Sequence, residues 1–271
     1  MTTITSRQNP LVARYRAAAR REGDDVLLLD GAHLVADAIA AGIRIEQVAM
    51  TAGAHGDPGL RELLAALSRA AVDVAIASTP VMDAISPVRS SSAIVALAKR
   101  PAMASEAVYA GAKTLVVVAV DVQDPGNVGA IVRVAEAGGA SGVIAAGATA
   151  DPFGWKALRG SMGSALRLPV VTGVAAADAI AEARRRGCRV IATAPRGGRS
   201  LFEIDLAGPL AILIGGEGHG LAPALIEAAV ERVTIPMQTP VESLNAAVTA
   251  ALLVYEARRQ RIQGSKSKVR S

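Results

Sequence analysis

Aromatic side chains are scarce in this chain of 271 residues, of which Phe, Trp and Tyr make up 2%. That scarcity argues against a protein that binds nucleic acid by stacking bases on an aromatic platform. The single cysteine, Cys188, cannot form an internal disulfide, so we expect a small buried residue beside a strand and a reducing, cytoplasmic compartment. The longest strongly apolar runs, such as residues 115–120, are far too short to cross a bilayer. The first ten residues contain no apolar core of a signal peptide, so we expect no secretory signal.

Two common nucleotide-binding motifs are also missing. Residues 114–147, TLVVVAVDVQDPGNVGAIVRVAEAGGASGVIAAG, have the order strand, turn, helix, strand that is typical of a nucleotide-binding α/β unit. The turn contains neither the G-x-G-x-x-G of a dinucleotide site nor the G-K-[ST] of a P-loop. These absences argue against a nicotinamide-dependent oxidoreductase, and we also predict no metal site.

Positive charge is what the sequence has in excess. The net charge is +5 and the isoelectric point is about 9.8. The cations gather near the two ends and in one internal group: Arg7, Arg14, Arg16, Arg20 and Arg21; Arg258, Arg259, Arg261, Lys266, Lys268 and Arg270; and Arg184, Arg185, Arg186 and Arg189. Such clusters are typical of a protein with a polyanionic partner. Solvated helix faces that keep an alanine-rich protein in solution would produce the same clusters, and charge alone leaves both interpretations open.

A small, partly polar stretch over residues 101–113 divides the chain, and we predict a linker there. In residues 1–100, Asn9 and Pro10 begin a helix, and alternating strands and helices then predict a small α/β domain. Residues 114–262 predict a second α/β domain. Its expected strands are 115–120, 142–146, 189–194, 210–214 and 232–237, and its expected helices are 127–138, 155–162, 175–187, 221–229 and about 243–260. Residues 263–271 predict a basic, disordered tail.

Three loops of the second domain carry unusual residues, each after a predicted strand. Ligands of open α/β sheets lie beyond the carboxyl ends of the strands, so we expect the three loops to meet. In the first loop, Pro125 and Gly126 predict a turn, Asn127 is expected to cap the next helix, and Arg133 lies in that helix.

The second loop contains four glycines within residues 215–220, a composition typical of a backbone that turns tightly or approaches a ligand. Glu217 in its middle can accept hydrogen bonds, and His219 is expected to be a solvated loop residue. The third loop leads into an apolar helix, where Asn245 is expected inside the first turn although Asn is unfavourable there. That placement indicates a functional role.

These residues carry a resemblance to a known family. The segments NVGAIVRVAEAGGASGVI, LIGGEGHGL and IPMQTPVESLNAAVTAALLVYEARRQ resemble the three ordered motifs of the SpoU (TrmH-like) branch of the SPOUT RNA methyltransferases. The first half, with SRQNPLVARYRAAARR and DGAHLVADAI, is similar to the RNA-binding domain often fused ahead of that catalytic domain. The resemblance implies a parallel sheet with a deep trefoil knot, S-adenosylmethionine as cofactor, a homodimer formed through the C-terminal domain, and methylation of a ribose 2′-hydroxyl in structured RNA.

The resemblance also assigns roles to residues of this chain. The cofactor would be held by Gly215, Gly216, Ile235, Met237 and Leu244. The reacting ribose would be met by Asn127 and Arg133, and Glu217, Ser243 and Asn245 would position the hydroxyl or support the loops. Family proposals make the motif arginine a base, but an arginine side chain is normally protonated. We therefore interpret Arg133 as a clamp on a phosphate or on the developing alkoxide, and the base remains open.

The expected RNA contacts are five arginines of the basic clusters and of the segment between the first two motifs: Arg7, Arg14, Arg16, Arg159 and Arg167. Ribosomal RNA is the favoured substrate, because the N-terminal domain resembles those of enzymes that modify ribosomal RNA. A transfer-RNA 2′-O-methyltransferase and a non-catalytic RNA-binding module of the same fold are the alternatives.

Overall fold

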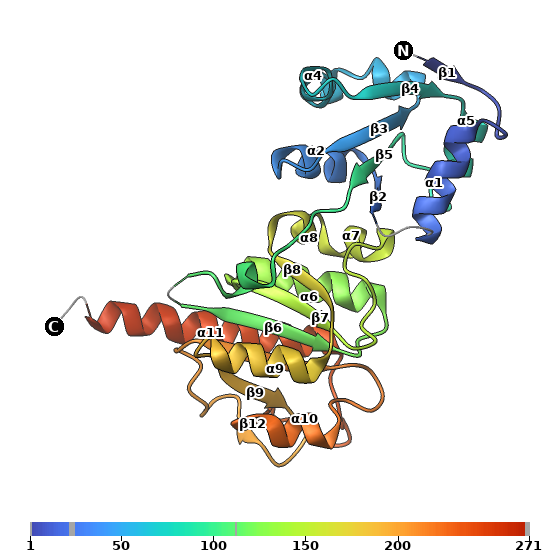
Figure 1. Ribbon diagram of the computed structural model, residues 1–271. Coiled ribbons are helices and arrows are strands. Elements are labelled where there is room, and N and C mark those ends of the chain that lie inside the picture. Colours follow the sequence, from blue (N-terminus) through green and yellow to red (C-terminus); the bar gives the residue numbers. More distant parts are fainter. Residues whose placement is uncertain (1, 22–24, 112, 269–271) are drawn as a thin grey trace. The chain divides into compact units, whose positions relative to one another are not determined.

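A computed structural model describes residues 2–21, 25–111 and 113–268 of the chain, and its backbone divides into two compact units (Figure 1). The first unit comprises residues 1–102 together with 153–167, and the second comprises 103–152 together with 168–271. Residues 153–167, which the sequence placed inside the second domain, therefore pack with the first unit. The chain therefore leaves the first unit after residue 102, returns to it at residue 153 and leaves it again after residue 167.

The first unit is a five-stranded sheet covered by short helices. The strand order is β1-β4-β3-β5-β2, with β5 antiparallel to both of its neighbours. Its strands are β1 (Thr2–Ile4), β2 (Val26–Asp30), β3 (Ile45–Met50), β4 (Asp73–Ala77) and β5 (Ile94–Lys99). Its helices are α1 (Pro10–Arg20), α2 (Ala32–Ala40), α3 (Ala52–His55), η1 (Pro58–Leu60), α4 (Arg61–Arg69), α5 (Thr79–Ile85), α7 (Trp155–Ser161) and α8 (Ser164–Arg167).

The first helix begins as its sequence predicts. The Asn9 side chain accepts a hydrogen bond from the Leu11 amide at 2.9 Å, and Pro10 occupies the first helical position. A proline is favourable there because its missing N–H would have no partner in the first turn. The buried face of α1, which includes Val12 and Tyr15, packs into the core of the first unit.

The second unit is built on a seven-stranded sheet in which all pairings are parallel. The order is β10-β12-β9-β11-β6-β7-β8. The strands are β6 (Leu115–Val120), β7 (Gly142–Ala146), β8 (Val170–Val174), β9 (Arg189–Thr193), β10 (Arg199–Ser200), β11 (Leu210–Gly215) and β12 (Glu231–Thr234). The helices are η2 (Ser105–Tyr109), α6 (Pro125–Gly138), α9 (Ala176–Arg185), α10 (Pro223–Ala228) and α11 (Ala246–Lys268).

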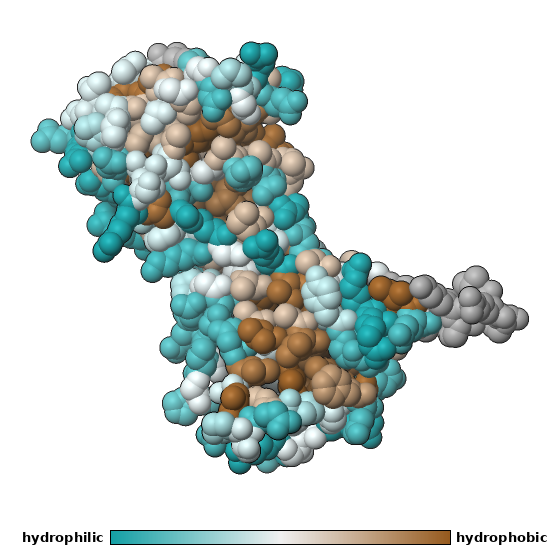
Figure 2. Space-filling view, turned by 180° about the vertical axis from the view of Figure 1, so that it is seen from behind, coloured by the Kyte–Doolittle hydropathy of each residue, from teal (hydrophilic) through white to brown (hydrophobic). Residues whose placement is uncertain are grey.

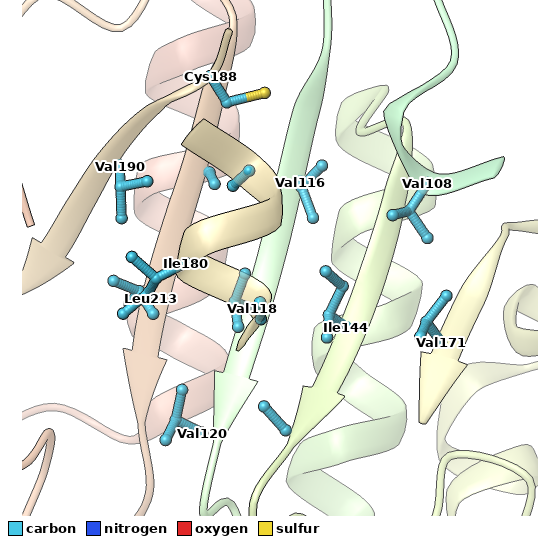
Figure 3. Close-up of a cluster of buried hydrophobic side chains, with 14 of the residues drawn as sticks. Val108, Val116, Val118, Val120, Ile144, Val171, Ile180, Cys188, Val190 and Leu213 are labelled. Atoms are coloured by element: carbon cyan, nitrogen blue, oxygen red, sulfur yellow. The ribbon is translucent and has the colours of Figure 1, made fainter. Parts of the chain in front are cut away.

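Both faces of the central strands are buried, which explains their continuous apolar sequence. On one face, alternate residues of β6 such as Val116 and Val118 form a cluster with Leu213 of β11 and Ile180 of α9 (Figure 3). Helices α6 and α11 cover the other face (Figure 1). They approach so closely that a methyl group on Gly138 would lie 2.1 Å from the Val254 side chain.

The C-terminal part of α11 is fastened to the sheet by one arginine. The half-buried Arg261 guanidinium donates hydrogen bonds to four main-chain carbonyls just before β6 and β11, those of Lys113, Thr114, Leu206 and Gly208. Burial lowers the pKa of this guanidinium from its ordinary value. It thus ties α11 to the edge of the sheet opposite the carboxyl ends of β6 and β11.

Several boundaries differ from the sequence-based expectation. The strands β1 and β8 were not predicted, because one is short and the other follows a polar, glycine-containing segment. Helix α11 begins at Ala246 and continues to Lys268, so it covers part of the segment expected to be a disordered tail. Residues 269–271 of that segment lie outside the described residues. The trefoil knot stays a prediction.

Candidate functional site

The candidate site lies at the carboxyl ends of β6 and β11, which are neighbours in the sheet. From β6 the chain builds outward through β7 and β8, and it then crosses to β9 on the other side. Ligands of open parallel sheets bind where the order of strands reverses in this way. The loops after β6 and β11 and the segment before α11 meet at this edge, as expected.

The first loop corrects one sequence-based assignment. Helix α6 begins at Pro125, and its cap is Asp124, whose carboxylate accepts a hydrogen bond from the Asn127 amide at 2.8 Å. The prediction that Asn127 caps this helix is wrong. Because Asp124 satisfies the helix terminus, the Asn127 side chain is available for other contacts.

Asn127 joins the three loops in a chain of side-chain hydrogen bonds. Its amide nitrogen donates to the Glu217 carboxylate of the second loop. Its amide oxygen accepts from the Asn245 amide nitrogen of the third loop at 2.9 Å. The oxygen of Asn245 in turn accepts from the main-chain amides of Ala247 and Val248, at 2.9 and 3.3 Å.

Asn245 therefore caps α11 and lies outside its first turn. The sequence analysis placed Asn245 inside the first turn, whereas the helix begins at the next residue, Ala246. The functional interpretation of an unfavourable Asn inside a helix loses its basis, since Asn is among the best N-cap residues. The hydrogen bond to Asn127 remains as the second contact of this side chain.

The donor and the acceptor of each hydrogen bond in this series of side chains follow from the groups at its two ends. Main-chain amides can only donate, so they hold the oxygen of Asn245 toward the helix and leave its NH₂ group facing Asn127. Asn127 must then present its oxygen to Asn245 and its NH₂ group to Glu217. An ionised carboxylate only accepts, so the arrangement is consistent at both ends. The first turn of α11 thus fixes the orientation of the Asn127 amide.

A cavity of about 480 Å³ lies beside this series of hydrogen-bonded side chains. Its wall includes all five residues predicted to hold a cofactor and three predicted to position the substrate, namely Gly215, Gly216, Ile235, Met237, Leu244, Glu217, Ser243 and Asn245. The wall also includes His219 and three residues at the end of β9 that the sequence gave no reason to select, Thr193, Ala194 and Pro195. The volume and mixed lining are typical of a small-molecule site.

Two glycines of the second loop are required by close approach of the backbone. A methyl group on Gly215 would lie 2.5 Å from the carbonyl carbon of Gly220. A methyl group on Gly216 would lie 2.0 Å from the carbonyl oxygen of Asp121, the residue after β6. Asp121 itself has a left-handed conformation (φ 56°), and its carboxylate accepts from the Ala148 amide at 2.7 Å. The loop after β11 is therefore packed directly against the end of β6.

Arg133 is not part of the hydrogen-bonded chain. It lies six residues beyond Asn127 on α6, about 9 Å along the helix axis. Its side chain is exposed, and it has no hydrogen bond or ion pair with another residue of the described ranges. Ser243 is exposed on the cavity wall, and its role stays a prediction.

The arginines predicted to contact RNA all have partners within the first unit. Arg7 and Arg16 donate to the carbonyls of Pro80 and Ala84, and Arg14 pairs with Glu46 at 3.0 Å. Two further ion pairs join α7 and α8 to the rest of the unit: Arg159 with Asp30 at 2.8 Å and Arg167 with Asp37 at 3.0 Å. RNA binding by these five residues stays a prediction.

Among the described residues, no helix combines the length and apolar character needed to cross a membrane. Within the same ranges, no group of three or more His, Cys, Asp and Glu side chains is arranged to hold a metal ion.

Comparison with known proteins gives this arrangement a family. The profile of the SpoU rRNA Methylase family matches residues 114–255, and the profile described as the N terminus of thiostrepton-resistance methylase matches residues 1–110. An uncharacterized tRNA/rRNA methyltransferase of Synechocystis sp. is 34% identical over 265 residues, which cover 96% of this chain and 94% of that protein.

Two further relatives have more specific names. The 23S rRNA (uridine(2479)-2′-O)-methyltransferase of Streptomyces viridochromogenes is 40% identical over 145 residues, and the match spans 52% of this chain and only 50% of that protein. The crystal structure of an AdoMet-bound rRNA methyltransferase from Sinorhizobium meliloti has 29% sequence identity and a TM-score of 0.85, and the match covers 95% of this chain and 97% of that one. The chain therefore belongs to the SpoU rRNA methylase family and carries the N-terminal domain found in thiostrepton-resistance methylases.

Proposed function

We propose that this protein is an S-adenosylmethionine-dependent methyltransferase that modifies a ribose 2′-hydroxyl of ribosomal RNA. The observation that carries the proposal is the chain Glu217–Asn127–Asn245 at the rim of a small-molecule cavity. The relatives that methylate 2′-oxygens in 23S rRNA and the AdoMet-bound rRNA methyltransferase support the same activity and the same cofactor. We infer a cytoplasmic location, since the named bacterial relative modifies ribosomal RNA and bacterial ribosomes are assembled in the cytoplasm.

The residues of the cavity fit such a cofactor. Its volume lies within the roughly 300–1,000 Å³ of small-molecule sites. Gly215 and Gly216 line the cavity and have no side chain, so they contribute only main-chain atoms to its wall, and Leu244 and Met237 add apolar surface. When bound, the cofactor supplies a sulfonium-activated methyl group. Main-chain recognition of the cofactor suits a loop whose glycines are already required by close packing of the backbone.

We assign orientation of the reacting ribose to Asn127 and Glu217. The Glu217 carboxylate can accept a hydrogen bond from a hydroxyl group, and the Asn127 NH₂ group holds that carboxylate in place. Holding the two reacting groups in line can contribute roughly 7–11 kcal/mol of the barrier. A guanidinium that is always charged suits Arg133 to a phosphate or a developing alkoxide, where one preorganised donor contributes about 2.7–4 kcal/mol.

We further propose a homodimer formed through α11. This helix exposes Val248, Leu252, Tyr255 and Ile262 at the spacing i, i+4, i+7 and i+14, which places them along one face of the helix. Figure 2 shows apolar side chains gathered on the surface of the second unit. A two-fold contact buries the same stripe on both subunits. Sedimentation equilibrium should give a dimer for the wild type and a monomer for Leu252→Glu.

Transfer of tritium from labelled S-adenosylmethionine to unmodified 23S rRNA transcribed in vitro tests the activity, with unmodified tRNA as the alternative substrate. We expect Arg133→Ala to lose transfer while its affinity for S-adenosylhomocysteine stays within about twofold, because Arg133 does not line the cavity. An equal loss of cofactor affinity would contradict the role given to Arg133. Thermal stabilisation by NAD in place of S-adenosylhomocysteine would contradict the proposed function itself.

A further inference from the structure

Among the described residues of the first unit, Asp30 is the one charged residue of an ion pair whose side chain is completely shielded from solvent. It ends β2, and its side chain is 0% exposed. One oxygen accepts from the Ser86 hydroxyl at 3.1 Å, and the other pairs with the NH1 nitrogen of Arg159 at 2.8 Å. A buried charge persists only where it is paired and hydrogen-bonded. Asp30 begins the segment DGAHLVADAI that carries part of the family resemblance, but the sequence assigned no role to Asp30 or to Ser86.

Arg159 enters this pair from one side only. Its side chain remains 46% exposed although NH1 is held by a buried group. Within the described ranges, Nε and NH2 of Arg159 have no hydrogen-bond partner. The pair therefore fixes the inner edge of the guanidinium and leaves donors on the outer side available. Such a planar fork matches the oxygens of a phosphate group.

A second cation lies on the same face of α7. Lys156 precedes Arg159 by three residues, is exposed and is placed over the Trp155 ring at 5.5 Å. Residues three apart on a helix are neighbours, and α7 contains no acidic residue. Trp155 in turn packs against the core of the first unit, which anchors α7.

We propose that Asp30, held by Ser86, is a positioning residue that orients Arg159 to bind an RNA phosphate, with Lys156 beside it. The inference rests on the proposed function, because it concerns how the same RNA substrate is held. A flexible arginine must lose rotamer freedom when it binds a phosphate, and Asp30 fixes the side chain in advance. The carboxylate does not touch the RNA.

A double-mutant cycle separates this role from a merely structural one. The variants are Asp30→Asn, Arg159→Gln and the two combined, and the probe is 23S rRNA transcribed in vitro. Thermal unfolding, affinity for S-adenosylhomocysteine and RNA affinity at several salt concentrations are measured for each. Arg159→Gln leaves the Asp30 carboxylate buried and unpaired, so it should lower Tm most, and the double variant should recover much of the loss.

The inference predicts a different pattern for RNA. Arg159→Gln should weaken RNA binding about tenfold and reduce the slope of log affinity against log salt by about 1. Asp30→Asn should also weaken RNA binding, and the double variant should be no better than Arg159→Gln. Arg159→Lys should not restore affinity, because an ammonium group lacks the planar fork. Cofactor affinity should be unchanged throughout.

Two results would overturn the inference. RNA affinity that follows Tm and recovers in the double variant would give the pair a structural role alone. Full RNA affinity in Asp30→Asn would show that Arg159 needs no orienting group. Neither result affects the proposed function, which is judged by methyl transfer with the wild-type enzyme.

Discussion

The substitution Asn245→Asp separates the two contacts of one side chain. A carboxylate caps a helix about as well as an asparagine, so the bonds to the amides of Ala247 and Val248 are kept. A carboxylate cannot donate, so the bond to Asn127 is lost. If the Asn127 amide turns to donate to the new carboxylate, its oxygen then faces Glu217. One of the two contacts of Asn127 is therefore repulsive in either orientation.

We expect Asn245→Asp to lower the rate of methyl transfer and to leave the stability of the fold unchanged. The lost hydrogen bond is worth about 1 kcal/mol, which corresponds to a roughly fivefold lower rate. Repulsion between two oxygens adds to this, so we expect kcat to fall about tenfold or more. Asn245→Ala, in contrast, also removes the cap, which costs about 0.5–2 kcal/mol of stability, or roughly 2–4 °C in Tm per kcal/mol.

The assay pairs thermal unfolding with tritium transfer at saturating cofactor and RNA. Asn9→Asp is the matched control, because Asn9 caps α1 in the same way and has no described contact with the cavity. It should keep both Tm and kcat. A wild-type kcat for Asn245→Asp would refute the reasoning, and so would a loss of Tm as large as that of Asn245→Ala.

Three further predictions follow from packing and burial. Gly216→Ala should weaken S-adenosylhomocysteine binding about tenfold in calorimetry, because its methyl group would meet a main-chain oxygen at 2.0 Å. Gly208→Ala is the control, because it adds a methyl group to open space and should bind normally. Equal affinities of the two variants would contradict this account. Arg261→Met should lower the free energy of unfolding in urea by roughly 2–3 kcal/mol, because four carbonyls lose a charged donor. Arg259→Met removes an exposed pair with Glu256 and should lower it by under about 1 kcal/mol. Burial raises the pKa of the Cys188 thiol, so less thiolate is present at a given pH, and iodoacetamide should label the native protein slowly at pH 8 and quickly once urea unfolds it; rapid labelling of native protein would show that the thiol is accessible.

The sequence predicted the sheet of the second unit better than the chemistry of its loops. Continuous apolar runs such as residues 115–120 mark strands buried on both faces, and the structure places β6 and β11 as expected. The strand β8 was missed because the segment before it, residues 153–167, is polar and contains glycines, and this segment packs with the first unit.

The assignment of caps in the second unit failed for a physical reason. Asp124 and Asn127 are both good N-cap residues, and only the position of Pro125 in the first turn decides between them. Asn245 was placed inside a helix because the apolar pattern of α11 gives no clear starting point. Hydrogen bonds between residues 90 and 118 positions apart, such as those joining Asn127 to Glu217 and to Asn245, have no local signature in a sequence.

The partners of the arginines were likewise beyond local reasoning. Arg159 and Asp30 are 129 residues apart, and their pairing follows from a segment that leaves one unit to complete the other. Charge clusters led us to expect a polyanionic partner, but they could not show which part of each guanidinium is already engaged.

Alkaline hydrolysis of 23S rRNA after incubation with the protein and S-adenosylmethionine tests the central claim most directly. Cleavage of an RNA backbone by base requires a free 2′-hydroxyl, so methylation of that oxygen protects one phosphodiester bond. The account predicts one protected bond that is absent when the cofactor is omitted or when Asn127 is replaced by Ala. Cleavage of every phosphodiester bond, with the transferred methyl group recovered on a base, would contradict it.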